Sequence, residues 1–131
     1  GIGQRCVEEA AKYAKQRKQF GVSVSTFQSV QNMLADMEIQ VQASRQAYLH
    51  AAELMDAGLP FTAEAAIAKT IGTDTGMKCA VDGVQIMGGY GYMKDYPMEK
   101  LMRDAKILQI YEGTNQIQRS VIAGQLLKKY H

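Results

Sequence analysis

The chain has 131 residues, which is enough for one domain with a hydrophobic core and too few for two domains of ordinary size. Hydrophobic residues make up 47% of the chain and charged residues 21%, a composition typical of globular proteins. The formal net charge of +2 is too small to indicate a protein that binds nucleic acid or anionic membranes.

Nothing in the sequence resembles a signal peptide, and no apolar run approaches the length that spans a membrane. Cys6 and Cys79 lie far apart with no CxxC motif, which argues against a metal site or a disulfide framework. We therefore expect a reducing compartment, by default the cytoplasm. The chain begins in helical sequence without a Met, so we expect a piece of a longer protein.

Helical periodicity predicts two helices in the first half of the chain. The first extends to about Lys18, and the second starts from a cap at Ser25 or Thr26. Gly58 and Pro60 should end the second helix, because glycine suits the C′ position and proline prevents the helix from resuming.

Three more helices are predicted in the second half. The first starts near Thr62 and ends at the glycines of Gly88–Tyr92. It is apolar over much of its surface, with Ile67 and Val81 among its apolar residues, so it should lie at the centre of the fold. A short helix over about 97–105 and a last helix over about 115–129 follow.

No segment alternates long enough to indicate a strand, although Val22–Ser25 alternates briefly. Short connections between long helices favour antiparallel neighbours. We therefore predict an all-α fold, an up-down helical bundle of four long helices plus a short one.

Two glycine-bearing breaks carry residues suited to a dinucleotide. At Arg17–Gly21, two cations and an amide could grip a phosphate and Phe20 could lie against a flat ring, although such cations also complement a helix dipole. At Gln85–Tyr92, paired glycines would let the backbone approach a pyrophosphate, with a glycine C-cap as the simpler alternative. A Rossmann site is excluded, because these glycines end a helix instead of linking a strand to one.

The third break delivers one carboxylate, Glu112, to the start of the last helix. Gly113 permits unusual backbone angles, Thr114 or Asn115 can cap the helix, and Gln118 is placed to answer either cap. Glu112 should therefore lie beside free backbone N–H groups, a suitable place for a catalytic acid or base. A surface glutamate at a helical corner is the alternative, and the pattern alone favours it.

The two histidines do not support a Ser–His or metal arrangement. His50 is expected in mid-helix and His131 is terminal, so both should be structural or solvent-facing. We expect the eight methionines to fill the core.

Four segments occur in a characteristic order: Arg17–Gly21, Gln85–Tyr92, Leu101–Ala105 and Ile110–Arg119. Together they closely resemble the C-terminal helical domain of the acyl-CoA dehydrogenases, and the likeness covers essentially the whole chain. The resemblance implies that residues 1–131 are this domain alone, without the family's N-terminal helical and middle β-domains. Most members of the family are homotetramers.

The resemblance implies an FAD-dependent oxidoreductase of fatty acid metabolism. In the family a carboxylate removes the α-proton of an acyl-CoA thioester as the β-hydride passes to N5 of FAD, which leaves a trans-2-enoyl-CoA. Electron-transferring flavoprotein usually reoxidises the flavin. Glu112 matches the family's usual base, and Tyr111 and Gly113 match positions that contact the substrate. A backbone N–H beside Glu112 would donate to the thioester oxygen.

Nine positions match flavin-contacting positions of the family. They are Arg17, Gln19, Phe20, Gln28, Gln85, Gly88, Gly89, Thr114 and Gln116. In the family many of them reach the FAD of a neighbouring subunit, so the resemblance implies a shared site. The Arg17 and Gly88–Gly89 stretches would serve the adenine–pyrophosphate half, with Thr114 and Gln116 nearer the dinucleotide link.

The segments that cover the flavin ring and help to bind the substrate in the family are missing from this sequence. We therefore expect the chain alone to bind FAD weakly or not at all, to be inactive, and to self-associate through uncovered faces. An acyl-CoA oxidase-type flavoenzyme and a non-catalytic oligomerisation module are the alternatives. The intact Tyr111–Thr114 motif argues against the second. In a eukaryote, the mitochondrial matrix would be the expected location.

Overall fold

A computed structural model describes residues 1–130, and His131 lies outside the described residues. The predicted all-α fold is confirmed, and His50 is an exposed residue in mid-helix, as expected. The helices of the described chain are α1 (Ile2–Gln16), α2 (Gln28–Asp56), α3 (Thr62–Met87), α4 (Gly89–Tyr92), α5 (Met98–Leu108) and α6 (Asn115–Leu127). A short hairpin, β1 (Lys18–Gln19) and β2 (Val22–Ser23), and a 3-10 helix, η1 (Val24–Thr26), join α1 to α2.

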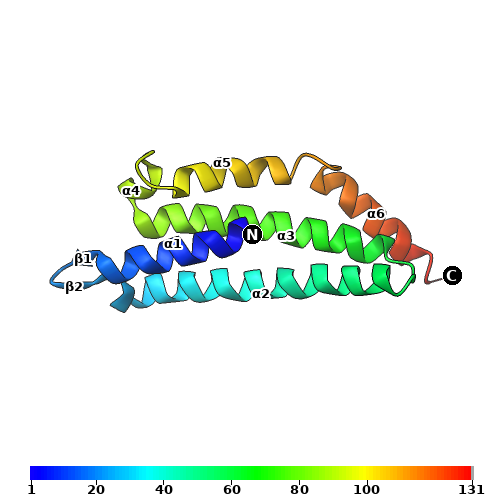
Figure 1. Cartoon of the computed structure of the whole chain (residues 1–131), viewed down its shortest axis with the longest axis horizontal. Coiled ribbons are helices and arrows are strands. Elements are labelled where there is room, and N and C mark those ends of the chain that lie inside the picture. Colours follow the sequence, from blue (N-terminus) through cyan, green and yellow to red (C-terminus); the bar gives the residue numbers. More distant parts are fainter. Residues whose placement is uncertain (131) are drawn as a thin grey trace.

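Helix α3 lies at the centre of the bundle, as predicted, because it contacts α1, α2, α5 and α6. Figure 1 shows α1 and α2 on one side of α3, with α5 and α6 following each other along its other side. The short helix and the last helix thus share one row, and the bend between them carries residues 109–114. We call these six residues the Glu112 turn.

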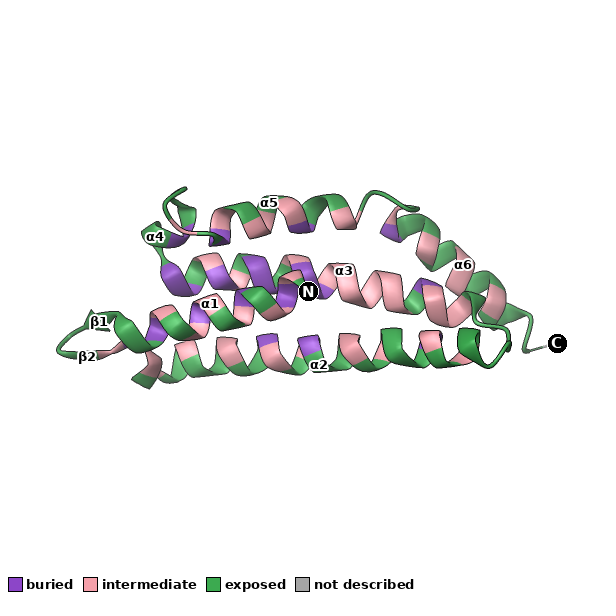
Figure 2. Cartoon of the chain, viewed as in Figure 1, coloured by how far each residue is buried: buried purple, intermediate pink, exposed green. Residues whose placement is uncertain are grey.

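Small residues let the helices of the core approach closely. A Cβ atom added to Gly3 of α1 would lie 3.2 Å from Val41 Cγ2, and one added to Gly83 of α3 would lie 2.6 Å from Met98 Sδ. Met37 and Met98 are fully buried, in agreement with methionine as core filler, although Met55 is more than half exposed. Figure 2 shows the buried residues concentrated on α1 and on the part of α3 beside it.

Two details of the helix surface differ from the prediction. Ile67 and Val81, expected on an apolar face of α3, are 41% and 46% exposed, because α3 turns this part of its surface away from the helices of this chain. The expected cap at Ser25 or Thr26 is also wrong. The chain first forms η1, which Ser23 caps by accepting a hydrogen bond from the Ser25 N–H (3.4 Å), and α2 then starts without a side-chain cap.

The predicted end of α2 is confirmed. Gly58 has φ +68°, which suits glycine, and its N–H donates to the Met55 carbonyl (3.0 Å). The Leu59 N–H donates to the Leu54 carbonyl (2.9 Å), which completes a Schellman ending. Pro60 follows at once and keeps the helix from continuing.

Cys6 and Cys79 are both free and fully buried. Burial raises the pKa of Cys6 to about 12 and that of Cys79 to about 11. Thiols with such pKa values stay protonated at neutral pH, so both behave as small apolar core residues with little reactivity.

Candidate functional site

The structure brings the first two glycine-bearing breaks together at one end of the bundle. Arg17 follows α1 directly and Gln19 lies in β1. Gly88 follows α3 directly, and Gly89 and Tyr90 belong to α4. These residues line a groove of about 660 Å³ whose floor includes buried residues of the core. We call it the Arg17 groove. Four of the nine expected flavin positions lie in it.

The Arg17 groove offers a cation beside an open stretch of backbone. The Arg17 Cζ lies 5.4 Å from the centre of the Tyr90 ring, in a cation–π contact. Gly88 has φ +62°, and no side chain other than those of adjacent residues lies within 4 Å of a Cβ placed at Gly88 or Gly89. A guanidinium next to accessible glycine backbone fits the charge and shape of a pyrophosphate.

The hairpin itself was not predicted. It pairs Lys18 with Ser23 and Gln19 with Val22, and its turn consists of Phe20 (φ +53°) and Gly21 (φ +79°). Two consecutive positive φ values are typical of the type I′ turn that matches strand twist. This turn leaves Phe20 92% exposed, with its ring 6.3 Å from that of Phe27. Because the Phe20 ring is so exposed, it is available for contact with another flat group.

Three expected flavin positions, Phe20, Gln28 and Gln85, do not line the Arg17 groove. Gln28 is the first residue of α2, and Gln85 lies in the last turn of α3; both side chains are exposed. The remaining two, Thr114 and Gln116, lie at the start of α6 and line a different groove of about 480 Å³, together with Asp74 and Gln109. The expected flavin positions therefore form two groups at the two ends of α5 (Figure 1).

The Glu112 turn has an unusual backbone. Glu112 has φ +54° and Gly113 has φ +83°. A left-handed conformation costs a residue other than glycine roughly 1–2 kcal/mol. Within residues 1–130, Glu112 and Phe20 are the two non-glycine residues with positive φ, and each is an expected site residue followed by a glycine. Backbone strain of this kind concentrates at functional sites.

At the start of α6, the predicted cap by Thr114 is confirmed, whereas the predicted role of Gln118 is wrong. Thr114 Oγ1 accepts a hydrogen bond from the Ile117 N–H (3.3 Å), as predicted. Gln118 does not form the reciprocal hydrogen bond of a capping box with the Thr114 N–H, because it lies one residue beyond the position that a capping box requires. Its Nε2 donates instead to the carbonyl of Glu112 (3.1 Å).

Glu112 and Tyr111 are exposed, so this chain alone does not desolvate the carboxylate. Free backbone N–H groups were expected beside it. Among the described residues, the N–H groups of Glu112 and Gly113 donate to no acceptor. The exposed carboxylate can accept a proton, and the two unpaired N–H groups beside it can donate hydrogen bonds to a carbonyl oxygen and polarise it.

A polar network between α3 and the Glu112 turn was not predicted from the sequence. Lys69 Nζ of α3 donates to the Gly113 carbonyl (2.8 Å) and to Asn115 Oδ1 (2.6 Å). Asn115, only 3% exposed, also donates from Nδ2 to Thr73 Oγ1 (2.8 Å) and to Asp74 Oδ1 (2.7 Å). The signal that could have revealed it is the set of polar residues Lys69, Thr73 and Asp74, which lie about one turn apart in the middle of α3.

Asp74 accepts hydrogen bonds from the first residue of the Glu112 turn and from α6, which follows the turn. Gln109 Nε2 donates to Oδ1 (2.8 Å), and Arg119 Nη2 donates to Oδ2 (2.8 Å) in an ion pair. Burial raises the pKa of Asp74, but hydrogen bonds from Arg119, Gln109 and Asn115 outweigh it and bring the pKa below its ordinary value. Asp74 is therefore ionised at neutral pH and accepts three hydrogen bonds.

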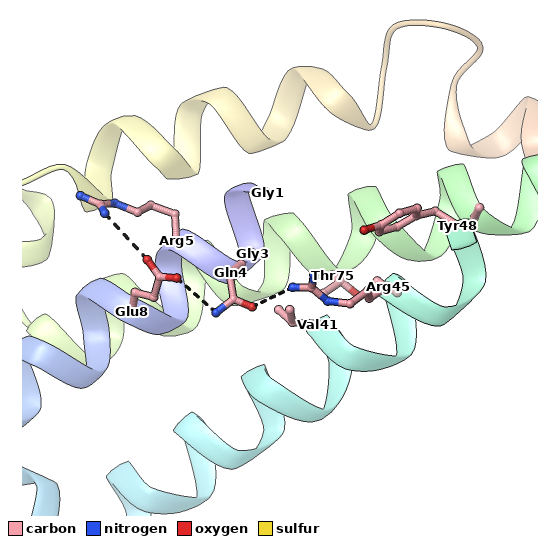
Figure 3. A pocket seen from close by; sticks show the side chains of 12 residues that line it. Gly1, Gly3, Gln4, Arg5, Glu8, Val41, Arg45, Tyr48 and Thr75 are labelled. Atoms are coloured by element: carbon pink, nitrogen blue, oxygen red, sulfur yellow. Dashed lines mark hydrogen bonds and ion pairs between the residues drawn. The ribbon is translucent and has the colours of Figure 1, made fainter. Parts of the chain in front are cut away.

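A further hollow, of about 410 Å³, lies between the start of α1 and the facing sides of α2 and α3 (Figure 3). Gln4 crosses it, accepting from Arg45 Nη2 (3.3 Å) and donating to Glu8 (3.3 Å). None of the expected site residues lines it. Elsewhere in residues 1–130, no group of three or more His, Cys, Asp or Glu side chains is arranged to bind a metal ion. No helix of this part combines the length and the hydropathy needed to cross a membrane.

Comparison with known proteins gives one consistent result. The chain is 51% identical over 127 residues to an acyl-CoA dehydrogenase of Bacillus subtilis, a match that covers 97% of this chain and 34% of the relative. The solved butyryl-CoA dehydrogenase of Megasphaera elsdenii superposes with a TM-score of 0.95 at 48% identity, over 96% of this chain and 33% of that one.

A third similar chain comes from a structure that concerns the electron-transferring flavoprotein of Acidaminococcus fermentans and flavin-based electron bifurcation. Its TM-score is 0.96 at 49% identity, over 97% of this chain and 33% of that one. The chain thus spans about a third of the length of each of these proteins. The family model of the acyl-CoA dehydrogenase C-terminal domain matches residues 1–127, so the chain belongs to the acyl-CoA dehydrogenase family, in which it corresponds to the C-terminal domain.

Proposed function

We propose that the full-length protein is an FAD-dependent acyl-CoA dehydrogenase and that residues 1–131 are its base-bearing C-terminal helical domain. The observation that carries this proposal is the left-handed backbone of Glu112, which presents one carboxylate beside two unpaired N–H groups. A helical corner without a function has no need of such a costly conformation at a glutamate.

Glu112 is the catalytic base in this proposal. Its carboxylate takes the α-proton of an acyl-CoA thioester, and the N–H of Glu112 or of Gly113 donates to the thioester oxygen as negative charge develops there. Tyr111 and Gly113 contact the substrate on either side of the base. Substrate binding would remove water from the exposed carboxylate and so make it a stronger base.

The Arg17 groove fits the anionic part of FAD, because it sets a guanidinium beside glycine backbone that no side chain covers. Arg17, Gln19, Gly88 and Gly89 would bind the adenine–pyrophosphate half, flanked by Gln28 and Gln85, and Phe20 would lie against a flat ring. When bound, FAD supplies the two-electron acceptor for the β-hydride. Thr114 and Gln116 would contact the dinucleotide link.

The two groups of flavin positions are separated by α5, a helix of 11 residues and about 16 Å. This separation supports a site that is shared between subunits, in which one copy supplies the Arg17 groove and its neighbour the base. Large apolar side chains also remain exposed along α2 and α6, such as Ile39 and Ile117. Exposed apolar surface of this kind supports a homo-oligomer, a tetramer in the full-length protein.

We infer that electron-transferring flavoprotein reoxidises the flavin. The similarity to a chain from a structure that concerns such a flavoprotein supports this partner. Because the described chain contains only part of an acyl-binding site, a panel of acyl-CoA thioesters of different chain lengths should be assayed on the full-length protein.

The test is Glu112→Gln in the full-length protein. The variant should retain FAD, seen in its absorbance spectrum, and should lose bleaching of the flavin by an acyl-CoA substrate. Glu53→Gln, an exposed change on α2, is the matched control and should bleach normally. Bleaching by Glu112→Gln at an undiminished rate would refute the assignment of the base.

The same preparation separates the alternatives. Rapid formation of peroxide in the presence of oxygen would indicate an acyl-CoA oxidase, since this fold and these residues serve both reactions. A full-length protein that never binds FAD would indicate a non-catalytic oligomerisation module. The isolated chain should be colourless and inactive, and a flavin spectrum in a preparation of it would contradict that expectation.

A further inference from the structure

We propose that Lys69 and Asp74 are positioning residues that fix the Glu112 turn to helix α3 through the buried side chain of Asn115. This inference deepens the proposed function and depends on it only for the catalytic consequence. The structural claim, that hydrogen bonds from α3 hold the turn, depends only on contacts within this chain.

The backbone conformation of the Glu112 turn must be held by contacts with residues outside the turn. Glu112 and Gly113 both have positive φ, and a non-glycine residue persists in this region only where its surroundings determine the conformation. Within the turn and the start of α6, Thr114 and Gln118 supply two hydrogen bonds. Both hydrogen bonds are exposed, so water competes with them.

Lys69 supplies the direct constraint. Its ammonium binds the Gly113 carbonyl at 2.8 Å, so the peptide group that follows Gly113 cannot rotate freely. Rotation of that peptide group would change the backbone angles of Gly113 and move Glu112. The same ammonium binds Asn115 Oδ1 at 2.6 Å, which ties the turn to the first residue of α6.

Asp74 supplies the second constraint, because its donors come from the first residue of the turn and from α6, which follows the turn. Gln109 ends the approach from α5, Asn115 begins α6, and Arg119 lies one turn further along α6. The Asn115 N–H also donates to the Gln109 carbonyl (3.0 Å), which closes the base of the turn. A network with all of its partners satisfied is rigid, and its anchor, α3, is the central helix of the bundle.

The test compares Lys69→Met with Lys78→Met in the full-length protein. Methionine has an unbranched side chain one heavy atom shorter than that of lysine, so it keeps most of the packing and removes the ammonium group. Lys78 lies on the same helix and pairs with Asp82 at the surface (2.6 Å), so it is a matched control. The readouts are amide hydrogen exchange over residues 109–118, the flavin content, and the rate of flavin bleaching by acyl-CoA as a function of substrate concentration.

We expect Lys69→Met to accelerate exchange over residues 109–118 and to lower the maximal bleaching rate roughly 10- to 100-fold, with flavin content and half-saturating substrate concentration little changed. Lys78→Met should alter none of these. The proposal is overturned if exchange over 109–118 is unchanged, or if the bleaching rate per bound flavin is unchanged while exchange rises. If the wild-type protein does not bleach at all, the proposed function fails, and exchange alone then decides whether Lys69 holds the turn.

Discussion

Arg17 and Tyr90 join the two halves of the Arg17 groove, because the Arg17 guanidinium carbon lies 5.4 Å from the centre of the Tyr90 ring. Tyr90 is itself supported by Tyr96, whose ring centre is 5.4 Å away, and Tyr96 packs edge-on to Tyr13. The aromatic cluster therefore sets the direction of the cation at the mouth of the groove. Arg17 is the C-cap residue of α1 and Tyr90 lies in α4, so the same contact also connects the end of α1 to α4.

Replacing Tyr90 by leucine should weaken FAD binding by the full-length protein. A cation–π contact at an exposed site is worth about 0.5–1 kcal/mol, which corresponds to about a two- to fivefold rise in the dissociation constant. Tyr90→Phe keeps the aromatic face and should bind FAD as the wild type does. Titration of the flavin-free protein measures both.

Tyr92→Leu is the control, because Tyr92 is 78% exposed and lies outside the groove. Equal weakening by Tyr90→Phe and Tyr90→Leu would show that the aromatic face of Tyr90 does not matter. Equal weakening by Tyr92→Leu would show that any change in this segment disturbs the site.

Local rules were enough to predict where most helices begin and end. Gly58, Pro60 and Thr114 act through backbone angles and hydrogen bonds within a few residues, so the sequence around each carries the information. The hairpin was missed because Phe20 takes a φ of +53°, which its side chain disfavours and no short-range pattern reveals.

The candidate site was harder to predict than the fold, for two reasons. The contacts of Asn115 reach Lys69 and Asp74 on a helix far earlier in the chain, and a propensity for a helix cap does not contain that partnership. A catalytic role of Glu112 was favoured over a surface glutamate only through the order of the family's motifs. Its pattern alone indicates a surface glutamate, and the chain indeed leaves it exposed.

Two glycine substitutions should change stability in opposite directions. A Cβ added to Gly91 would lie 2.9 Å from both Cα and the carbonyl oxygen of Val84, and backbone atoms of a helix cannot move aside easily. Gly91→Ala should therefore lower the free energy of unfolding by about 1–3 kcal/mol. Gly124 lies inside α6 with no such neighbour within 4 Å, so Gly124→Ala should raise it by about 0.5–1 kcal/mol.

Urea denaturation of this chain, followed by circular dichroism, measures both changes against the wild type. Gly91→Ala with unchanged stability would mean that α4 can shift away from α3 without cost. A destabilised Gly124→Ala would mean that the outer face of α6 is covered in the folded protein.

The stability contributed by Asp74 should depend on pH in the acid range. Hydrogen bonds from Arg119, Gln109 and Asn115 overcome the effect of burial and bring the folded-state pKa of Asp74 below its ordinary value of 3.8. The ionised carboxylate therefore stabilises the fold above pH 3.8, and this gain is lost as the pH falls through 3.8 toward the lower folded-state pKa. Solvent screens part of the gain, since the side chain is 39% exposed.

Asp74→Asn should accordingly be less stable than the wild type at pH 7, and the difference in free energy of unfolding should shrink between pH 5 and pH 3. A difference that stays constant over that range would contradict the charge-based account, and would leave the geometry of the Asn115 contact as the cause.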